Sequence, residues 1–290
     1  SLLYELKQLD PINYLLVKDE AWVVNDNVLT IPMPNSDLAK CRFHEIQDIL
    51  LGIFRDRFQM DIQIGFNFRE EDKTALKEAH EIAEKYETLI SMHVAEMDYE
   101  MKEFRETYDM TPVEYLDSIG VLSDRLVAAH CIHVNEHDMK LMAGRGTSVA
   151  HCVGSNMKAG KGIAPVKEMI EHGIAVGLGT DGPSSGNTLD LFTQMKTAVY
   201  AQKTHYKDRS LFKAEEIVKL ATIGGAKALK MDARIGSLEV GKQADIVLIE
   251  TDSVNMFPIY DPYSAIVYSA NASNVDSVWI NGVRVLNHKQ

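Results

Sequence analysis

The feature that most constrains the fold is a regular alternation of short apolar runs and helix-like segments between residues 61 and 202. Each apolar run has the length of a strand, and the segment behind it has apolar residues spaced for one face of a helix. This alternation indicates βαβ units and a parallel sheet. Right-handed crossovers then favour an open doubly wound sheet or a barrel. The predicted strands are 61–68, 89–93, 126–130, 147–151 and 174–180, and the predicted helices are 74–86, 97–108, 112–119, 137–144, 162–173 and 189–202.

Both ends of the chain depart from this alternation. Short strand-like runs occur within residues 14–31, and after a predicted helix at 214–229 the chain again becomes rich in strand-like runs. Among these runs we expect strands at Ala265–Tyr268 and at Val275–Val285. The second is broken by Asn281-Gly282, a strong hairpin signature. We therefore expect the C-terminal fifth to form a small β-rich unit, to which the early strands contribute from the other end of the chain.

The composition narrows the class of protein. Hydrophobic residues make up 46% of the chain and charged residues 25%, as in ordinary globular enzymes. The net charge of -12 argues against a nucleic-acid partner or an anionic membrane surface. No apolar run reaches the roughly 18 residues of a membrane span, and residues 1–10 lack the pattern of a signal peptide. Three cysteines, Cys41, Cys131 and Cys152, are expected to be reduced thiols of a cytoplasmic protein.

Polar residues follow several of the predicted strands. The carboxyl ends of parallel strands are where enzymes of this architecture place their chemistry. Histidine and carboxylate groups at one such edge suit Zn²⁺ or Fe²⁺, and a glutamate beside them suits proton transfer. The spacing therefore favours a metal-assisted hydrolytic site over a set of satisfied core residues. The strand-end residues are His93, Glu96, His130, His133, His151 and Asp181. No Gly-rich dinucleotide fingerprint follows any predicted strand.

Several motifs in order resemble the amidohydrolase superfamily, and within it the 5-methylthioadenosine/S-adenosylhomocysteine deaminase and chlorohydrolase branch. The resemblance covers about residues 60–285. It implies an α/β fold: a TIM-like (β/α)₈ barrel over 34–233 with a small β-sandwich built from both chain ends, 1–33 and 234–290. The motifs are His93-Val-Ala-Glu96, Ala129-His130-Cys131, Ser155-Asn156-Met157-Lys158 with Gly162-Ile163-Ala164-Pro165, Gly177-Leu-Gly-Thr-Asp181-Gly, and Ile235-Gly-Ser-Leu-Glu-Val-Gly-Lys-Gln-Ala-Asp245.

The resemblance also implies roles for individual residues. His93 and Asp181 correspond to ligands of a single divalent metal, Zn²⁺ in the first place and Fe²⁺ as the alternative. Asp181 also takes a proton from the attacking water, Glu96 passes a proton to the substrate ring nitrogen, and His130 orients and polarises the nucleophile. Ser185 falls where this branch contacts substrate. The implied activity is hydrolytic deamination of a small molecule, an adenine-type nucleoside such as 5-methylthioadenosine or S-adenosylhomocysteine.

Alternatives remain open at this point. A chlorohydrolase, or a guanine- or cytosine-type deaminase, would use the same scaffold, and a catalytically inactive barrel would serve as a binding module. The family's first two metal ligands form a His-x-His pair that this sequence lacks, with Ser36-Asp37-Leu38 in the corresponding place. Either the sequence contains only the ordered parts of a longer chain, which we favour, or the barrel is truncated and lacks a competent metal site. The sequence also leaves a homo-oligomer open.

Overall fold

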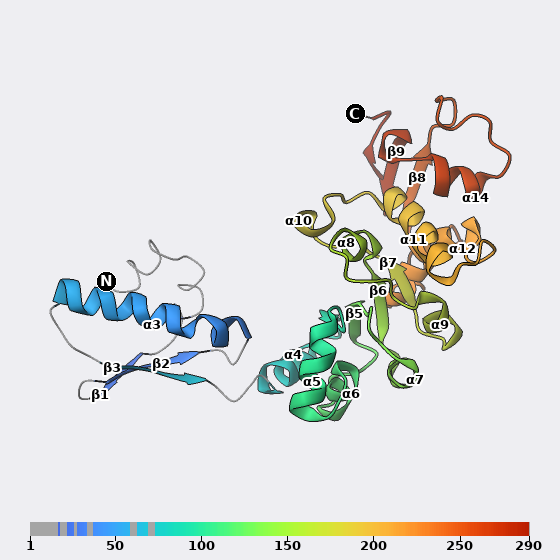
Figure 1. Ribbon diagram of the computed structural model, residues 1–290. Coiled ribbons are helices and arrows are strands. Elements are labelled where there is room, and N and C mark those ends of the chain that lie inside the picture. The colour runs from blue at the N-terminus through green and yellow to red at the C-terminus, as the bar shows by residue number, and fades with distance from the viewer. Residues whose placement is uncertain are drawn as a thin grey trace. The chain divides into compact units, whose positions relative to one another are not determined.

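The computed structural model of the protein describes residues 17, 22–25, 28–33, 37–58, 63–68 and 73–289. The chain divides into two compact units, residues 1–75 and 76–290 (Figure 1). Among the described residues, no helix combines the length and the apolar character needed to cross a membrane.

In the part of the first unit that the structure describes, a three-stranded sheet lies with one long helix. Strand β1 pairs antiparallel with β2, and β2 pairs parallel with β3 after the crossover helix α3. Positions alternate between buried and partly buried along β2, so Leu29, Ile31 and Met33 share its buried face. They form one apolar cluster with residues of α3 at helical spacing, including Ile46 and Leu50. The elements are β1 (Val23–Asn25), β2 (Val28–Met33), α3 (Asp37–Phe58) and β3 (Gln63–Phe68).

Four parallel strands form the central sheet of the second unit, in the order β4-β5-β6-β7. All five residues of β5 are buried, as expected where helices cover a parallel sheet. All five strands predicted between residues 61 and 180 are present as β3 to β7, which confirms the α/β interpretation. After α4 (Lys73–Lys85), the elements are β4 (Ile90–Val94), α5 (Asp98–Tyr108), α6 (Pro112–Ser118), β5 (Leu126–His130), α7 (Glu136–Arg145), β6 (Ser148–His151), α8 (Val153–Lys158), α9 (Val166–Glu171), β7 (Val176–Leu178), α10 (Pro183–Gly186) and α11 (Leu191–Tyr206).

The helix predicted over 162–173 is shorter than expected. It begins only at Val166, because Pro165 disfavours a helical conformation in the residue before it.

The next helical stretch packs directly on β7. It consists of α12 (Ala214–Lys219), a π-helical turn η1 (Leu220–Gly224) and α13 (Gly225–Ala228). A Cβ atom on Gly177 would lie 2.7 Å from the Cα atom of Gly225, and one on Gly224 would lie 2.6 Å from the carbonyl oxygen of Val176. Only glycine permits this approach of two backbones.

The C-terminal region contains a separate antiparallel sheet, in the order β10-β9-β8. The hairpin predicted at Asn281-Gly282 joins β9 to β10. The strand predicted at Ala265–Tyr268 is wrong: these residues are helical, because the Asp261 side chain caps a helix that starts with Pro262. The elements are β8 (Ile246–Ile249), α14 (Pro262–Ser264), η2 (Ala265–Ser269), η3 (Ala272–Asn274), β9 (Val275–Ile280) and β10 (Val283–Leu286).

Candidate active site

The structure brings four of the predicted site residues together at the carboxyl edge of the central sheet. Nε2 of His130 lies 3.4 Å from Oε1 of Glu96 and 4.0 Å from Oδ2 of Asp181. Nδ1 of His93 lies 4.0 Å from Oε2 of Glu96, and the rings of His93 and His130 are 4.9 Å apart between centroids. His130 is therefore the centre of the cluster.

Backbone hydrogen bonds tie the end of β5 to the end of β4. The amide of Cys131 donates to the carbonyl oxygen of Val94 over 3.1 Å, and the amides of Ile132 and His133 donate to that of Ala95 over 3.0 Å. His130 itself has a φ of +71°. A non-glycine residue in this region costs about 1–2 kcal/mol. The turn at the strand end thus stores strain beside a chemically important side chain, as active sites often do.

The environment of His130 determines which ring nitrogen carries its proton. Its side chain is buried, and its Nδ1 donates a hydrogen bond to Oδ1 of Asn156 over 2.7 Å. The neutral ring therefore presents the lone pair of Nε2 to Glu96 and Asp181. Nε2 can accept a proton or hold an electrophile.

Asp181 is held in its ionised form. Its Oδ1 accepts a hydrogen bond from the backbone of Gly182 over 2.6 Å. Partial burial would raise the pKa of the Asp181 carboxyl. Hydrogen bonds from Gly182 and from the Ser155 hydroxyl, together with the charges of His130 and His93, outweigh burial and lower that pKa below its usual value.

Glu96 is paired with a lysine that the sequence analysis did not single out. Nζ of Lys161 forms an ion pair with Oε1 of Glu96, and the two side chains are only 20% and 12% exposed. Lys161, Ser155 and Asn156 all come from α8 and the loop behind it. Ser155 and Asn156 belong to one of the sequence motifs given above, but that motif assigned them no role. The only sequence signal near Lys161 is the pair of glycines on either side of it, Gly160 and Gly162.

Ser185 and His151 do not join the cluster. Ser185 lies exposed in α10, and its backbone oxygen accepts a hydrogen bond from Nζ of Lys158 over 2.8 Å. In residues 73–289, no hydrogen bond links its hydroxyl to the four clustered residues. His151 is buried in β6, and neither ring nitrogen has a hydrogen-bond partner among the described residues. Burial, with the nearby charge of His130, lowers the pKa of His151 to about 4.

The clustered residues fit a divalent metal. Ligand atoms of His93, Glu96 and His130 all lie within 4.8 Å of one another, and Asp181 adjoins His130. Imidazole nitrogen and carboxylate oxygen are ligands that Zn²⁺ and Fe²⁺ accept.

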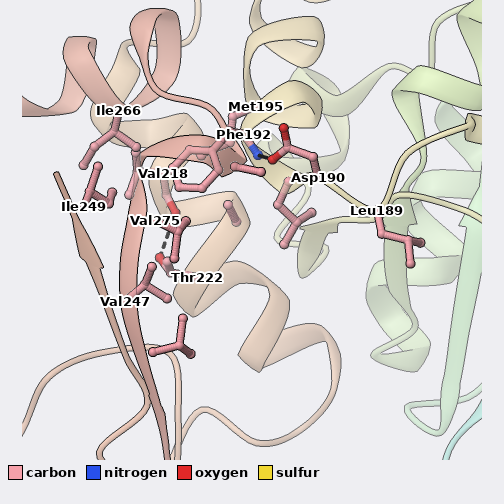
Figure 2. Close-up of a pocket in the computed structure, with 14 residues that line it drawn as sticks. Leu189, Asp190, Phe192, Met195, Val218, Thr222, Val247, Ile249, Ile266 and Val275 are labelled. Carbon is pink, nitrogen blue, oxygen red and sulfur yellow. Dashed lines mark hydrogen bonds between the residues drawn. The ribbon is translucent and has the colours of Figure 1, made fainter. Parts of the chain in front are cut away.

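The structure also has a large apolar pocket, which Figure 2 shows between α11, η1, β8 and β9. Its volume is about 450 Å³, and of the described residues that line it only Asp190 is charged. The Asp190 carboxylate caps α11 by accepting a hydrogen bond from the backbone of Phe192. Because this carboxylate already serves as the helix cap, the described lining offers no further charged group for acid–base chemistry.

Comparison with known proteins gives the chain a family. Residues 37–285 match the amidohydrolase family. The chain is 42% identical over 207 residues to a 5'-deoxyadenosine deaminase of Methanothermobacter thermautotrophicus, an alignment that covers 71% of this chain and 48% of that protein. It is 41% identical over 215 residues to a 5-methylthioadenosine/S-adenosylhomocysteine deaminase of Thermoanaerobacter pseudethanolicus, covering 74% and 50%. The chain thus spans about half the length of the curated relatives it matches.

Solved structures agree with this assignment. A zinc-bound adenosine deaminase from Xanthomonas campestris superimposes with a TM-score of 0.73 at 29% identity, over 90% of this chain and 61% of that one. An atrazine chlorohydrolase from Arthrobacter aurescens superimposes with a TM-score of 0.71 at 24% identity, over 84% and 56%, and shows a shared fold.

Proposed function

The chain belongs to the amidohydrolase family, and we propose that it catalyses the metal-dependent hydrolytic deamination of an adenine-type nucleoside. The observation that carries this proposal is the position of His130, whose Nε2 faces both the Glu96 and the Asp181 carboxylates. A base, an acid and an orienting imidazole within a few ångströms of one another are what replacement of an amino group by water requires.

We assign the metal to His93 and Asp181, with Zn²⁺ as the preferred ion. The zinc in the related adenosine deaminase supports the choice of ion, and His93 belongs to a compact group of possible metal ligands with Glu96 and His130. When bound, a divalent cation supplies Lewis acidity, which makes water nucleophilic near neutral pH.

The side chains then divide the proton transfers between them. Asp181, whose carboxyl has a lowered pKa, is ionised and accepts a proton from the attacking water at Oδ2. His130 orients that water through Nε2, because Asn156 holds the proton on Nδ1. Glu96 donates a proton to the ring nitrogen of the substrate, regains one from the hydroxyl group of the tetrahedral intermediate, and passes it to the departing amino group, which leaves as ammonia.

We infer the substrate class from the relatives. Those deaminases are named for 5'-deoxyadenosine and for 5-methylthioadenosine and S-adenosylhomocysteine. An adenine ring with a modified 5' position is therefore the proposed substrate. Ser185 is kept as a proposed substrate contact, because its turn follows Asp181 directly along the chain.

We also propose that residues 34–233 belong to a (β/α)₈ barrel and that 1–33 and 234–290 contribute to one β-sandwich. The C-terminal sheet supports the second proposal, because Val247, Ile280, Val283 and Val285 are all more than half exposed. An apolar sheet surface of this kind requires a covering layer.

Cytoplasmic location remains a proposal as well, supported by the buried free thiols of Cys131 and Cys152. A small molecule is the only class of partner that we propose.

The test is release of ammonia by the 290-residue chain after loading with Zn²⁺. The panel contains 5-methylthioadenosine, S-adenosylhomocysteine and 5'-deoxyadenosine, with guanine, cytosine and atrazine as comparison substrates. We expect turnover of the adenine nucleosides, and a kcat at least 10²-fold lower in Glu96→Gln, roughly the contribution of a positioned acid–base group. Turnover of atrazine or guanine alone would overturn the substrate class, and failure to bind Zn²⁺ would overturn the mechanism.

A further inference from the structure

We infer that Lys161 is a positioning residue that keeps Glu96 out of the coordination shell of the metal and so reserves its carboxylate for proton transfer. This inference rests on the proposed deaminase function and names a device of the same site. It starts from a conflict in the geometry. Glu96 has the position of a metal ligand, since its oxygens lie with His93 and His130 in one compact group, yet the chemistry requires it to carry a proton.

Lys161 resolves this conflict because its ammonium group occupies one oxygen of that carboxylate. Oε1 of Glu96 is the atom that faces Nε2 of His130, and the same oxygen forms the ion pair with Nζ of Lys161. Both side chains of the pair are largely buried, so water screens the pair only weakly. A divalent cation that bound Oε1 as well would face a positive charge on the same oxygen, and one that bound Oε2 would lie next to that charge.

Among the described residues, no lysine pairs with the other acidic and imidazole groups of the cluster. Asp181 receives neutral donors, the Gly182 amide and the Ser155 hydroxyl, and its Oδ2 faces His130. His93 is exposed at the rim of the site. In the described residues, the charge of Lys161 therefore distinguishes one carboxylate from the other: Asp181 is free to bind metal, and Glu96 is not.

The backbone delivers Lys161 to this position. Its amide donates to the carbonyl oxygen of Asn156 over 2.9 Å, and its neighbours Gly160 and Gly162 have φ angles of +65° and +122°. A Cβ atom on Gly162 would lie 2.9 Å from Cγ2 of Ile132, so the loop lies close against the residues that follow β5. These angles and this approach require glycine.

One short segment thus controls two groups of the site. The Asn156 side chain fixes the ring of His130, and its backbone carbonyl anchors the residue that pairs with Glu96. A change in the position of this segment would alter the orienting imidazole and the acid together.

The experiment compares Lys161→Gln, which removes the charge, with Lys161→Arg, which retains it. Lys140→Gln is the matched control, because Lys140 forms an exposed ion pair with Glu136 on α7. Each chain is loaded with Co²⁺, whose visible absorption reports the number and type of its ligands. Metal affinity is measured by titration calorimetry, and kcat and KM by ammonia release.

We expect Lys161→Gln to bind Co²⁺ roughly tenfold more tightly, with a changed absorption spectrum, because Glu96 becomes a ligand. Its kcat should fall by about 10- to 100-fold while KM stays within about twofold, since only the proton carrier is lost. Lys161→Arg should restore the wild-type spectrum and most of kcat. The Lys140→Gln chain should resemble the wild type in every measurement.

An unchanged spectrum and affinity in Lys161→Gln would overturn the inference, as would a wild-type chain that binds no Co²⁺. Equal losses in Lys161→Gln and Lys161→Arg would also overturn it, because they would indicate a steric role. Absence of ammonia release by the wild-type chain would contradict the proposed deaminase function alone. In that case the Co²⁺ spectra and affinities still decide whether Lys161 excludes Glu96 from the metal.

Discussion

Oδ1 of Asn156 accepts a hydrogen bond from Nδ1 of His130 over 2.7 Å, and both side chains are buried. The bond fixes the orientation and the tautomer of the ring, because the proton on Nδ1 leaves the lone pair on Nε2. Glu96 and Asp181 both face that nitrogen. A residue of α8 thus controls the basic atom at the centre of the site.

Substitution of Asn156 tests this control. In Asn156→Ala the ring loses its acceptor and can rotate or change tautomer. We expect kcat for ammonia release to fall roughly 10- to 100-fold, and the free energy of unfolding to fall by about 1–3 kcal/mol because Nδ1 is left buried without a partner. Asn156→Asp keeps an acceptor oxygen and should retain most of kcat. Equal activity in all three proteins would show that His130 is oriented by other contacts.

His151 makes the stability of the fold depend on pH. Burial, with the charge of His130, lowers the pKa of His151 from 6.5 to about 4. Between these values the unfolded chain binds a proton that the folded chain does not, so stability falls as the pH falls through this window. The loss is complete near pH 4, and at most it amounts to about 3 kcal/mol.

The variant His151→Leu should abolish this part of the pH dependence. Urea unfolding measured from pH 7 to pH 4 should show a shallower decline than in the wild type. Stability at pH 7 should be equal or higher, because a partnerless imidazole is replaced by an apolar side chain. His137→Gln, a change at an exposed histidine, should keep the wild-type decline. If the free energy of unfolding of His151→Leu declined between pH 7 and pH 4 as steeply as that of the wild type, the acid sensitivity would come from the carboxylates instead.

The sequence predicted which residues would lie together at the sheet edge, because strand ends can be recognised locally. His93, His130 and Asp181 each stand at or just behind a short apolar run, and parallel strands bring such positions to one edge. Lys161 could not be predicted in this way. It comes from a loop between helices, and its contact with Glu96 depends on how α8 packs. The spacing of apolar residues in the sequence does not reveal that packing.

The errors in secondary structure have similar physical causes. Ala265–Tyr268 is a short apolar run, and such runs are ambiguous between a strand and a buried helical turn. Asp261 and Pro262 decide the outcome, since the first caps the helix and the second fits its first turn. His151 ends β6 as predicted but remains without a polar partner among the described residues, because strand position alone does not determine where a side chain points.

The two buried cysteines should resist thiol reagents in the folded protein. Burial, with the nearby charge of Asp181, raises the pKa of Cys152 to about 11, and burial raises the pKa of Cys131 further. At pH 8 only about one Cys152 side chain in a thousand is a thiolate, which is the reactive form. In a Cys41→Ser background, we expect no labelling by iodoacetamide at pH 8 until urea unfolds the chain. Rapid labelling of either thiol in the native protein would contradict the burial.

We expect Gly177, where β7 approaches the helical segment behind it, to tolerate no side chain. In Gly177→Ala the new methyl group would lie 2.7 Å from the Cα atom of Gly225, a backbone atom that cannot move aside as a flexible side chain would. We expect a loss of about 1–3 kcal/mol in the free energy of unfolding, the usual cost of an overpacked core. Because β7 leads to Asp181, metal affinity should fall in the same variant.

Gly144→Ala provides the matched control for that substitution. Gly144 lies in α7, and a Cβ atom there would meet nothing within 4 Å. Alanine should therefore stabilise the protein by about 0.5–1 kcal/mol through its higher helix propensity. Urea unfolding and Zn²⁺ titration of both variants separate a local clash from a general effect of removing glycine. If Gly177→Ala were as stable as the wild type and bound Zn²⁺ equally well, the start of α13 would have to lie farther from β7 than the structure places it.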